Sequence, residues 1–104
     1  SFNFGPKNSE VVSVKKILDY IKECWPGFSW VKSNNIVKNE TDVLVLNTNK
    51  AYKLLKWKTR LNVKQSTNFT IEWYKKFYIS KQKKNVITNF TKKQIFDYYK
   101  KFGI

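Results

Sequence analysis

Apolar side chains recur at helical spacing in the first quarter of the chain. They form one stripe at Val14, Ile17, Leu18, Ile21 and Trp25, and Pro26-Gly27 follows this stripe directly. The i, i+3, i+4 spacing is typical of a helix with one buried face. Asn8 or Ser9 is a suitable N-cap, and the Pro-Gly pair is expected to end the helix. The pattern therefore predicts one amphipathic helix before residue 26.

Three short stretches favour extended structure instead. Phe2-Asn3-Phe4 alternates apolar and polar residues before a Gly5-Pro6 turn, residues 28–32 alternate in the same way, and residues 43–46 are a brief apolar run. Alternation with a period of two is typical of a strand that is buried on one face. Two or three short strands are therefore expected.

Further helices are predicted in the second half of the chain. Asn47 or Thr48 is expected to cap a short helix that runs through Leu55, and Asn62 is expected to cap a longer one. The stretch 91–94 reads Thr-Lys-Lys-Gln, a capping-box sequence that predicts the start of a final helix. The predicted fold is one α+β domain over 1–104, mostly helical, with about four helices and two or three short strands.

Charge is the strongest feature of the composition. The chain of 104 residues has a formal net charge of +14, and Arg60 is the only arginine among its 21 basic residues. Arginine is preferred for reading bases and for bidentate phosphate contacts. Two interpretations remain open: the lysines form a solvated helix surface, or they attract polyanions such as nucleic acid or an acidic partner chain.

The residues offer little catalytic chemistry. The chain contains no histidine, which excludes Ser-His-Asp and Cys-His catalysis. Tyr52 and Lys56 have the Tyr-x-x-x-Lys spacing of short-chain dehydrogenases, but one such pair is expected by chance among six tyrosines and many lysines. Glu40 and Asp42 are too few carboxylates for a metal site. No catalytic, cofactor-binding or metal-binding residue is predicted.

The setting is expected to be the cytoplasm. Cys24 is the single cysteine, so it cannot form an internal disulfide, and a buried, inert thiol is the expected role. No apolar run is long enough for a transmembrane helix, and no membrane partner is expected. The abrupt start at Ser1 is typical of a segment taken from a longer protein.

Read in order, the landmarks resemble the carboxy-terminal lobe of extended short-chain dehydrogenase/reductase enzymes that act on sugar nucleotides, the CDP-glucose 4,6-dehydratase family above all. Six stretches spread over nearly the whole chain carry the resemblance: Phe2-Asn3-Phe4-Gly5-Pro6; Val11 to Trp25; Glu40 through Asn47; Lys50-Ala51 with Leu55, Trp57 and Arg60; Thr70-Ile71-Glu72-Trp73-Tyr74; and Thr91, Gln94, Ile95 and Tyr98. The first stretch resembles an Asn-Phe-Gly-Pro strand-turn of the family, the second a helix that ends in tryptophan, and the third the segment Glu-x-x-x-Leu-x-Leu-Asp. The fourth resembles Lys-Ala…Leu-Gly-Trp-x-Pro-Arg, the fifth Thr-Val-x-Trp-Tyr, and the sixth Thr-x-x-Gln-Ile-x-x-Tyr.

The chain also departs from the family pattern. Four substitutions stand out, with the usual residue in brackets: Asn47 (acid), Lys56 (glycine), Thr59 (proline) and Leu61 (a frequent tryptophan). Related dehydratases often have an arginine near the nucleotide diphosphate, before the acidic segment. In this chain that region offers only Lys38.

The resemblance implies that catalysis and substrate positioning belong to different domains. A separate Rossmann domain, in cis or on another chain, would hold NAD and the catalytic groups. The lobe represented here would position a CDP-sugar for dehydration in bacterial deoxysugar and O-antigen synthesis, and would be inactive alone. Glu40 and Lys38 are then expected to face the sugar nucleotide, with Asn3 and Gly5 shaping the floor of the pocket. The alternatives are a stand-alone basic module that binds nucleic acid, and a domain that docks an acidic protein.

Overall fold

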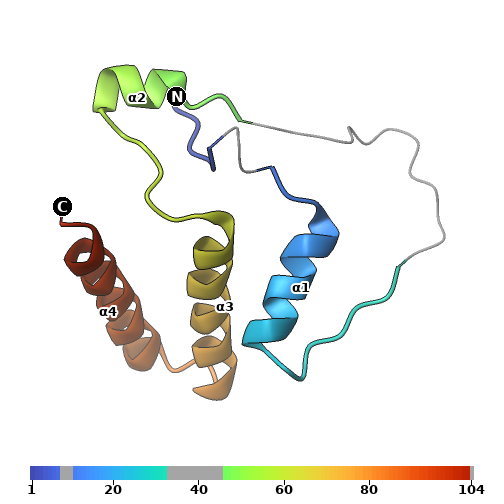
Figure 1. Cartoon of the computed structure of the whole chain (residues 1–104). Coiled ribbons are helices and arrows are strands. Elements are labelled where there is room, and N and C mark those ends of the chain that lie inside the picture. Colours follow the sequence, from blue (N-terminus) through green and yellow to red (C-terminus); the bar gives the residue numbers. More distant parts are fainter. Residues whose placement is uncertain (8–10, 33–45, 104) are drawn as a thin grey trace.

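Helices are the regular elements in the part of the chain that the structure describes. The computed structural model describes residues 1–7, 11–32 and 46–103. Within these ranges it contains four helices and no strand: α1 (Val14–Cys24), α2 (Asn49–Leu55), α3 (Val63–Ile79) and α4 (Lys84–Phe102). Helix α3 lies between α1 and α4, and α2 lies across one end of this group (Figure 1).

Helix α1 forms where the apolar stripe predicts it. Its N-cap is Ser13, whose hydroxyl accepts a hydrogen bond of 3.1 Å from the backbone N–H of Lys16. The predicted caps Asn8 and Ser9 lie outside the described residues, and Ser13 takes their role because it is adjacent to the first helical residue. The helix ends at Cys24, immediately before Trp25 and the Pro-Gly pair, as predicted.

Helix α3 begins at the predicted cap. Asn62 accepts a hydrogen bond of 2.7 Å from the backbone N–H of Gln65, and the Gln65 side chain returns one of 2.9 Å to the backbone of Asn62. This reciprocal pair is a capping box, and it satisfies two N–H groups that the helix start would leave without partners. The predicted start of this helix, directly after Asn62, is therefore confirmed.

The predicted start of the last helix is wrong. Helix α4 begins at Lys84, so Thr91 and Gln94 lie inside it instead of capping it. The Thr91 hydroxyl accepts a hydrogen bond of 2.8 Å from the indole N–H of Trp73, and the Gln94 amide donates one of 2.8 Å to the carbonyl of Phe69. Both side chains contact α3, so the residues that resemble a cap are contacts between two helices.

The predicted strands are also wrong where they can be assessed. Residues 2–4 and 28–32 are neither helix nor strand, and of the run 43–46 only Leu46, which is not in a strand, lies within the described residues. A strand is stable when a neighbouring strand pairs with its backbone. None is present in the described ranges, and Phe4 instead packs its ring edge-on against Trp57, with centroids 4.9 Å apart.

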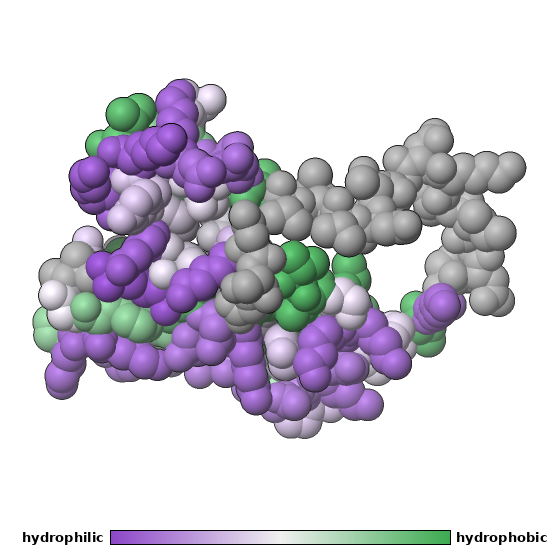
Figure 2. Space-filling model, turned by 45° about the horizontal axis from the view of Figure 1, so that its top comes forward, coloured by the Kyte–Doolittle hydropathy of each residue, from purple (hydrophilic) through white to green (hydrophobic). Residues whose placement is uncertain are grey.

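The described part of the chain buries few side chains. Only Ala51 and Ile71 are buried among its hydrophobic residues, whereas Val14, Leu54 and Phe96 are each exposed by at least 66%. In the space-filling view, hydrophilic side chains cover much of the visible face and apolar atoms emerge between them (Figure 2). A helical group with so small an interior depends strongly on each buried contact.

Candidate ligand-binding cavity

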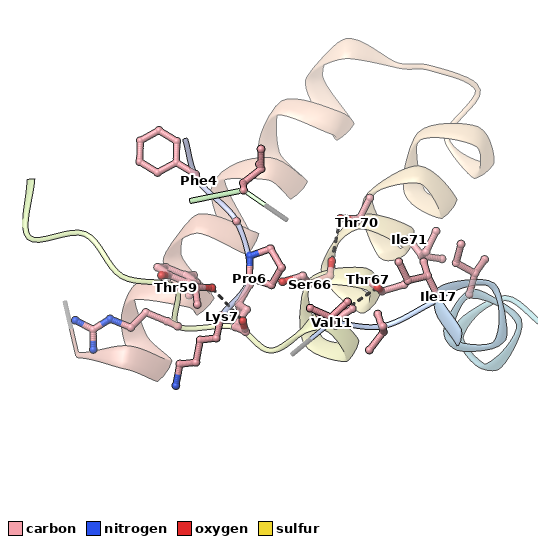
Figure 3. Close-up of a pocket in the computed structure, with 18 of the residues that line it drawn as sticks. Phe4, Pro6, Lys7, Val11, Ile17, Thr59, Ser66, Thr67, Thr70 and Ile71 are labelled. Carbon is pink, nitrogen blue, oxygen red and sulfur yellow. Dashed lines mark hydrogen bonds between the residues drawn. The ribbon is translucent and has the colours of Figure 1, made fainter. Parts of the chain in front are cut away.

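A large cavity opens between α1, α3 and the two segments that precede α1 and α3. Its volume is about 800 Å³, within the range of about 300 to 1,000 Å³ that is usual for small-molecule sites. Figure 3 shows Pro6 facing Ser66 across this space, with Val11 and Ile17 near Thr67 on one side. The cavity is lined by six parts of the chain: residues 4–7, α1 with Val11 and Val12 before it, Leu46, Trp57 with residues 59–61, α3, and Tyr98 of α4.

The α3 wall of the cavity carries hydroxyl groups among apolar side chains. Thr67 donates a hydrogen bond of 2.8 Å to the carbonyl of Val63, and Thr70 donates one of 2.9 Å to the carbonyl of Ser66. Because these protons are occupied by the helix backbone, the remaining lone pairs of both hydroxyls act as acceptors. The wall can therefore accept hydrogen bonds from a ligand while it presents methyl groups for packing.

Two cationic side chains border the same cavity. Lys7 follows the Gly5-Pro6 turn, and Arg60 lies in the connector between α2 and α3. Within the described residues neither has an ion-pair partner. A cavity with apolar walls and two cations that have no ion-pair partner among the described residues suits an anionic ligand that also carries an apolar or ring portion.

The amino-terminal segment is held against α2 and the connector. The ammonium group of Lys50 donates a hydrogen bond of 3.0 Å to the carbonyl of Ser1 and lies 5.2 Å from the ring centroid of Phe2. A Cβ atom on Gly5 would lie 3.4 Å from Cβ of Leu46, so the backbone passes close to that side chain. These contacts place Gly5 and Pro6 at the edge of the cavity.

Of the four residues predicted to contact a substrate, Gly5 lines the cavity. Asn3 is exposed and is not part of the lining. Lys38 and Glu40 lie outside the described residues, as does Asp42. Arg60 and the α3 hydroxyls also line the cavity, although the sequence did not predict them as site residues. The sequence contains two signals for Arg60: it is the single arginine, close to a tryptophan, and it belongs to one of the stretches of family resemblance.

The remaining chemical candidates lie elsewhere. Tyr52 is 56% exposed on α2, and neither it nor Lys56 lines the cavity. The Cys24 thiol is half-buried and donates a hydrogen bond to the side-chain oxygen of Asn68. In the described ranges no three histidine, cysteine or acidic side chains gather into a possible metal site. None of the helices in those ranges has the length and apolar character needed to cross a membrane.

Comparisons with family models, curated proteins and solved structures find no match for this chain.

Proposed function

We propose that this chain is the substrate-positioning lobe of an enzyme similar to CDP-glucose 4,6-dehydratase, and that it binds a sugar nucleotide in the cavity beside α3. The observation that carries the proposal is the convergence of the family-like segments. All six stretches of resemblance contribute lining residues, among them Gly5, Ile17, Leu46, Trp57, Thr70 and Tyr98.

A backbone feature also supports the proposal. Lys56 is the C-cap of α2 and adopts a left-handed conformation, with φ 56° and ψ 23°. The resembled family has glycine at this position, and glycine is the residue that adopts this conformation without a steric penalty. The backbone conformation at Lys56 therefore favours glycine, the residue that the family pattern has at this position.

The chemistry of the cavity fits a nucleoside diphosphate sugar. Arg60 and Lys7 supply positive charge for the diphosphate, and Trp57 supplies an aromatic surface for the base or the sugar ring. The Thr67 and Thr70 hydroxyls accept hydrogen bonds from sugar hydroxyls. In this proposal Arg60 has the phosphate-binding role that the sequence left to Lys38. Glu40, Lys38 and Asn3 remain candidate substrate contacts.

The chain itself would bind and orient the substrate. It has no Gly-x-Gly-x-x-Gly sequence, so NAD would belong to a Rossmann domain in cis or on another chain. NAD would supply oxidation at sugar C4 and return of the hydride at C6 around the loss of water. The residues described here would hold the sugar nucleotide against that domain.

An NMR titration of the chain with CDP-glucose tests the proposal. Shifts are expected at Gly5, the Trp57 indole and Thr70, and Arg60→Ala should weaken binding at least about tenfold, which corresponds to about 1.4 kcal/mol. Lys58→Ala is the matched control, since Lys58 lies in the same connector and does not line the cavity.

Three results would count against the proposal or its parts. Equal weakening by the Arg60 and Lys58 substitutions would show that only net charge matters. Equal affinity for CDP-glucose and inorganic pyrophosphate would remove the sugar-nucleotide assignment. A titration that perturbs the cavity but leaves Asn3, Lys38 and Glu40 unchanged would remove those three residues from the site.

The second candidate function is polyanion binding, and the charge distribution favours it. Glu72 and Asp97 are the only acidic residues between 46 and 103, where most of the lysines lie. Binding to duplex or single-stranded oligonucleotides that stays tight at high salt would support this function. Weak binding that disappears as salt rises would leave the lysines as a solvated surface.

A further inference from the structure

Helix α4 presents apolar side chains on two different faces. One face packs on α3 through Thr91, Gln94 and Phe90, which are half-buried. On the other face, Ile95 is 53% exposed, Phe96 is 66% exposed and Tyr99 is 48% exposed. Tyr99 lies four residues after Ile95 and three after Phe96, so the three side chains form one continuous surface, here called the α4 outer patch. Packing on α3 does not account for them.

Exposed lysines border the α4 outer patch beside Phe96, and among the described residues Lys93 alone of them has an ion-pair partner. Lys92 and Lys100 are each four residues from Phe96, and Lys93 is three residues from it. The single acidic residue of the helix, Asp97, is paired with Lys93 at 3.0 Å. No other ion pair involves an α4 lysine within the described residues. The patch is therefore an apolar surface with a positive rim.

We infer that the α4 outer patch docks an acidic protein surface, an amphipathic helix with apolar residues on one side and carboxylates beside them. Charge complementarity selects this partner, since an apolar centre with a charged rim favours a partner of the same pattern and opposite sign. The inference is independent of sugar-nucleotide binding, because the three patch residues do not line the cavity.

Other occupants fit the patch less well. A second copy would bring two lysine rims together, because a two-fold contact pairs the same surface with itself. Nucleic acid would use the lysines but leave Ile95 and Phe96 without a role. An anionic membrane would need a broader apolar face than three residues, and the opposite face of α4 is held by α3.

The test uses a synthetic helical peptide with leucine at every third or fourth position and glutamate between, and measures its affinity for the whole chain by fluorescence anisotropy. Phe96→Ser and Lys92→Glu should each weaken binding about tenfold or more. Ile79→Ser and Lys15→Glu are the controls, since Ile79 is 72% exposed on α3 and Lys15 is exposed on α1. Both controls should bind like the unchanged chain, and circular dichroism should show the same helix content in every variant.

Four outcomes would overturn the inference. Equal binding of a scrambled peptide of the same composition would show attraction by charge alone. Peptide binding unaffected by Phe96→Ser would place the contact elsewhere. Binding to phosphatidylserine vesicles but not to the peptide would identify a membrane surface. Self-association that Phe96→Ser abolishes, seen by sedimentation velocity, would identify a second copy as the occupant.

Discussion

The indole N–H of Trp73 donates a 2.8 Å hydrogen bond to the hydroxyl of Thr91, and this bond joins α3 to α4. The same hydroxyl donates to the carbonyl of Ile87 at 2.8 Å, so Thr91 connects the backbone of one helix to a side chain of the other. Trp73 also stacks on Phe77, with centroids 5.3 Å apart and an interplanar angle of 11°. The hydrogen bond therefore links the stacked aromatic pair of α3 to α4 through Trp73.

Removing this hydroxyl should destabilise the chain. Thr91→Val keeps the shape of the side chain but leaves the half-buried indole N–H without its partner, so the free energy of unfolding should fall by about 1–2 kcal/mol. Urea denaturation followed by circular dichroism measures the change. Thr91→Ser keeps the hydroxyl and should lose less than half as much. In a Trp73→Phe background Thr91→Val should cost clearly less, and an unchanged cost there would show that the two residues are not coupled.

Replacing Lys56 with glycine should stabilise the chain. The left-handed conformation at Lys56 costs a side-chain-bearing residue free energy that glycine avoids, so Lys56→Gly should raise the free energy of unfolding by about 1 kcal/mol. Lys56→Ala separates the loss of charge from the backbone effect, because alanine retains Cβ. Thermal or urea unfolding should rank glycine above both lysine and alanine. A glycine variant no more stable than the alanine variant would contradict this account.

The small interior should make the stability sensitive to one isoleucine. Ile71 is 9% exposed at the centre of α3, whereas Ile79 is 72% exposed at the end of the same helix. Removing one methylene group by Ile71→Val should cost about 1 kcal/mol, and Ile79→Val should change stability by less than about 0.5 kcal/mol. The pair has identical chemistry and differs in burial, so equal costs measured by urea denaturation would argue against Ile71 as a core residue.

Local signals in the sequence were sufficient to predict α1 and the start of α3. The apolar stripe of residues 14–25 and the cap at Asn62 depend on neighbours within one or two helical turns, so periodicity and capping chemistry predict them directly. The mostly helical character of the chain follows from the same signals. Gly5 was also predicted for the site, and it borders the cavity.

Sequence patterns whose role depends on distant partners led to wrong predictions of a helix start and of a strand. Thr91 and Gln94 look like a cap in sequence, and their partners Trp73 and Phe69 lie on another helix. Residues 2–4 have the alternation of a strand, but no described segment pairs with their backbone. The same local pattern is compatible with two roles, and the contact made by the side chain or backbone decides between them.

The sequence by itself determined which segments form amphipathic helices, the strong positive charge and the scarcity of catalytic side chains, because each of these depends on residue type and short-range order. Only the tertiary structure decided that Arg60, Lys7 and the Thr70 hydroxyl border one cavity, and that Ile95, Phe96 and Tyr99 remain exposed on α4. These residues come from segments far apart in the chain or from a helix with apolar residues on both faces. Their surroundings depend on how α1, α3 and α4 pack, and spacing along one segment does not encode that packing.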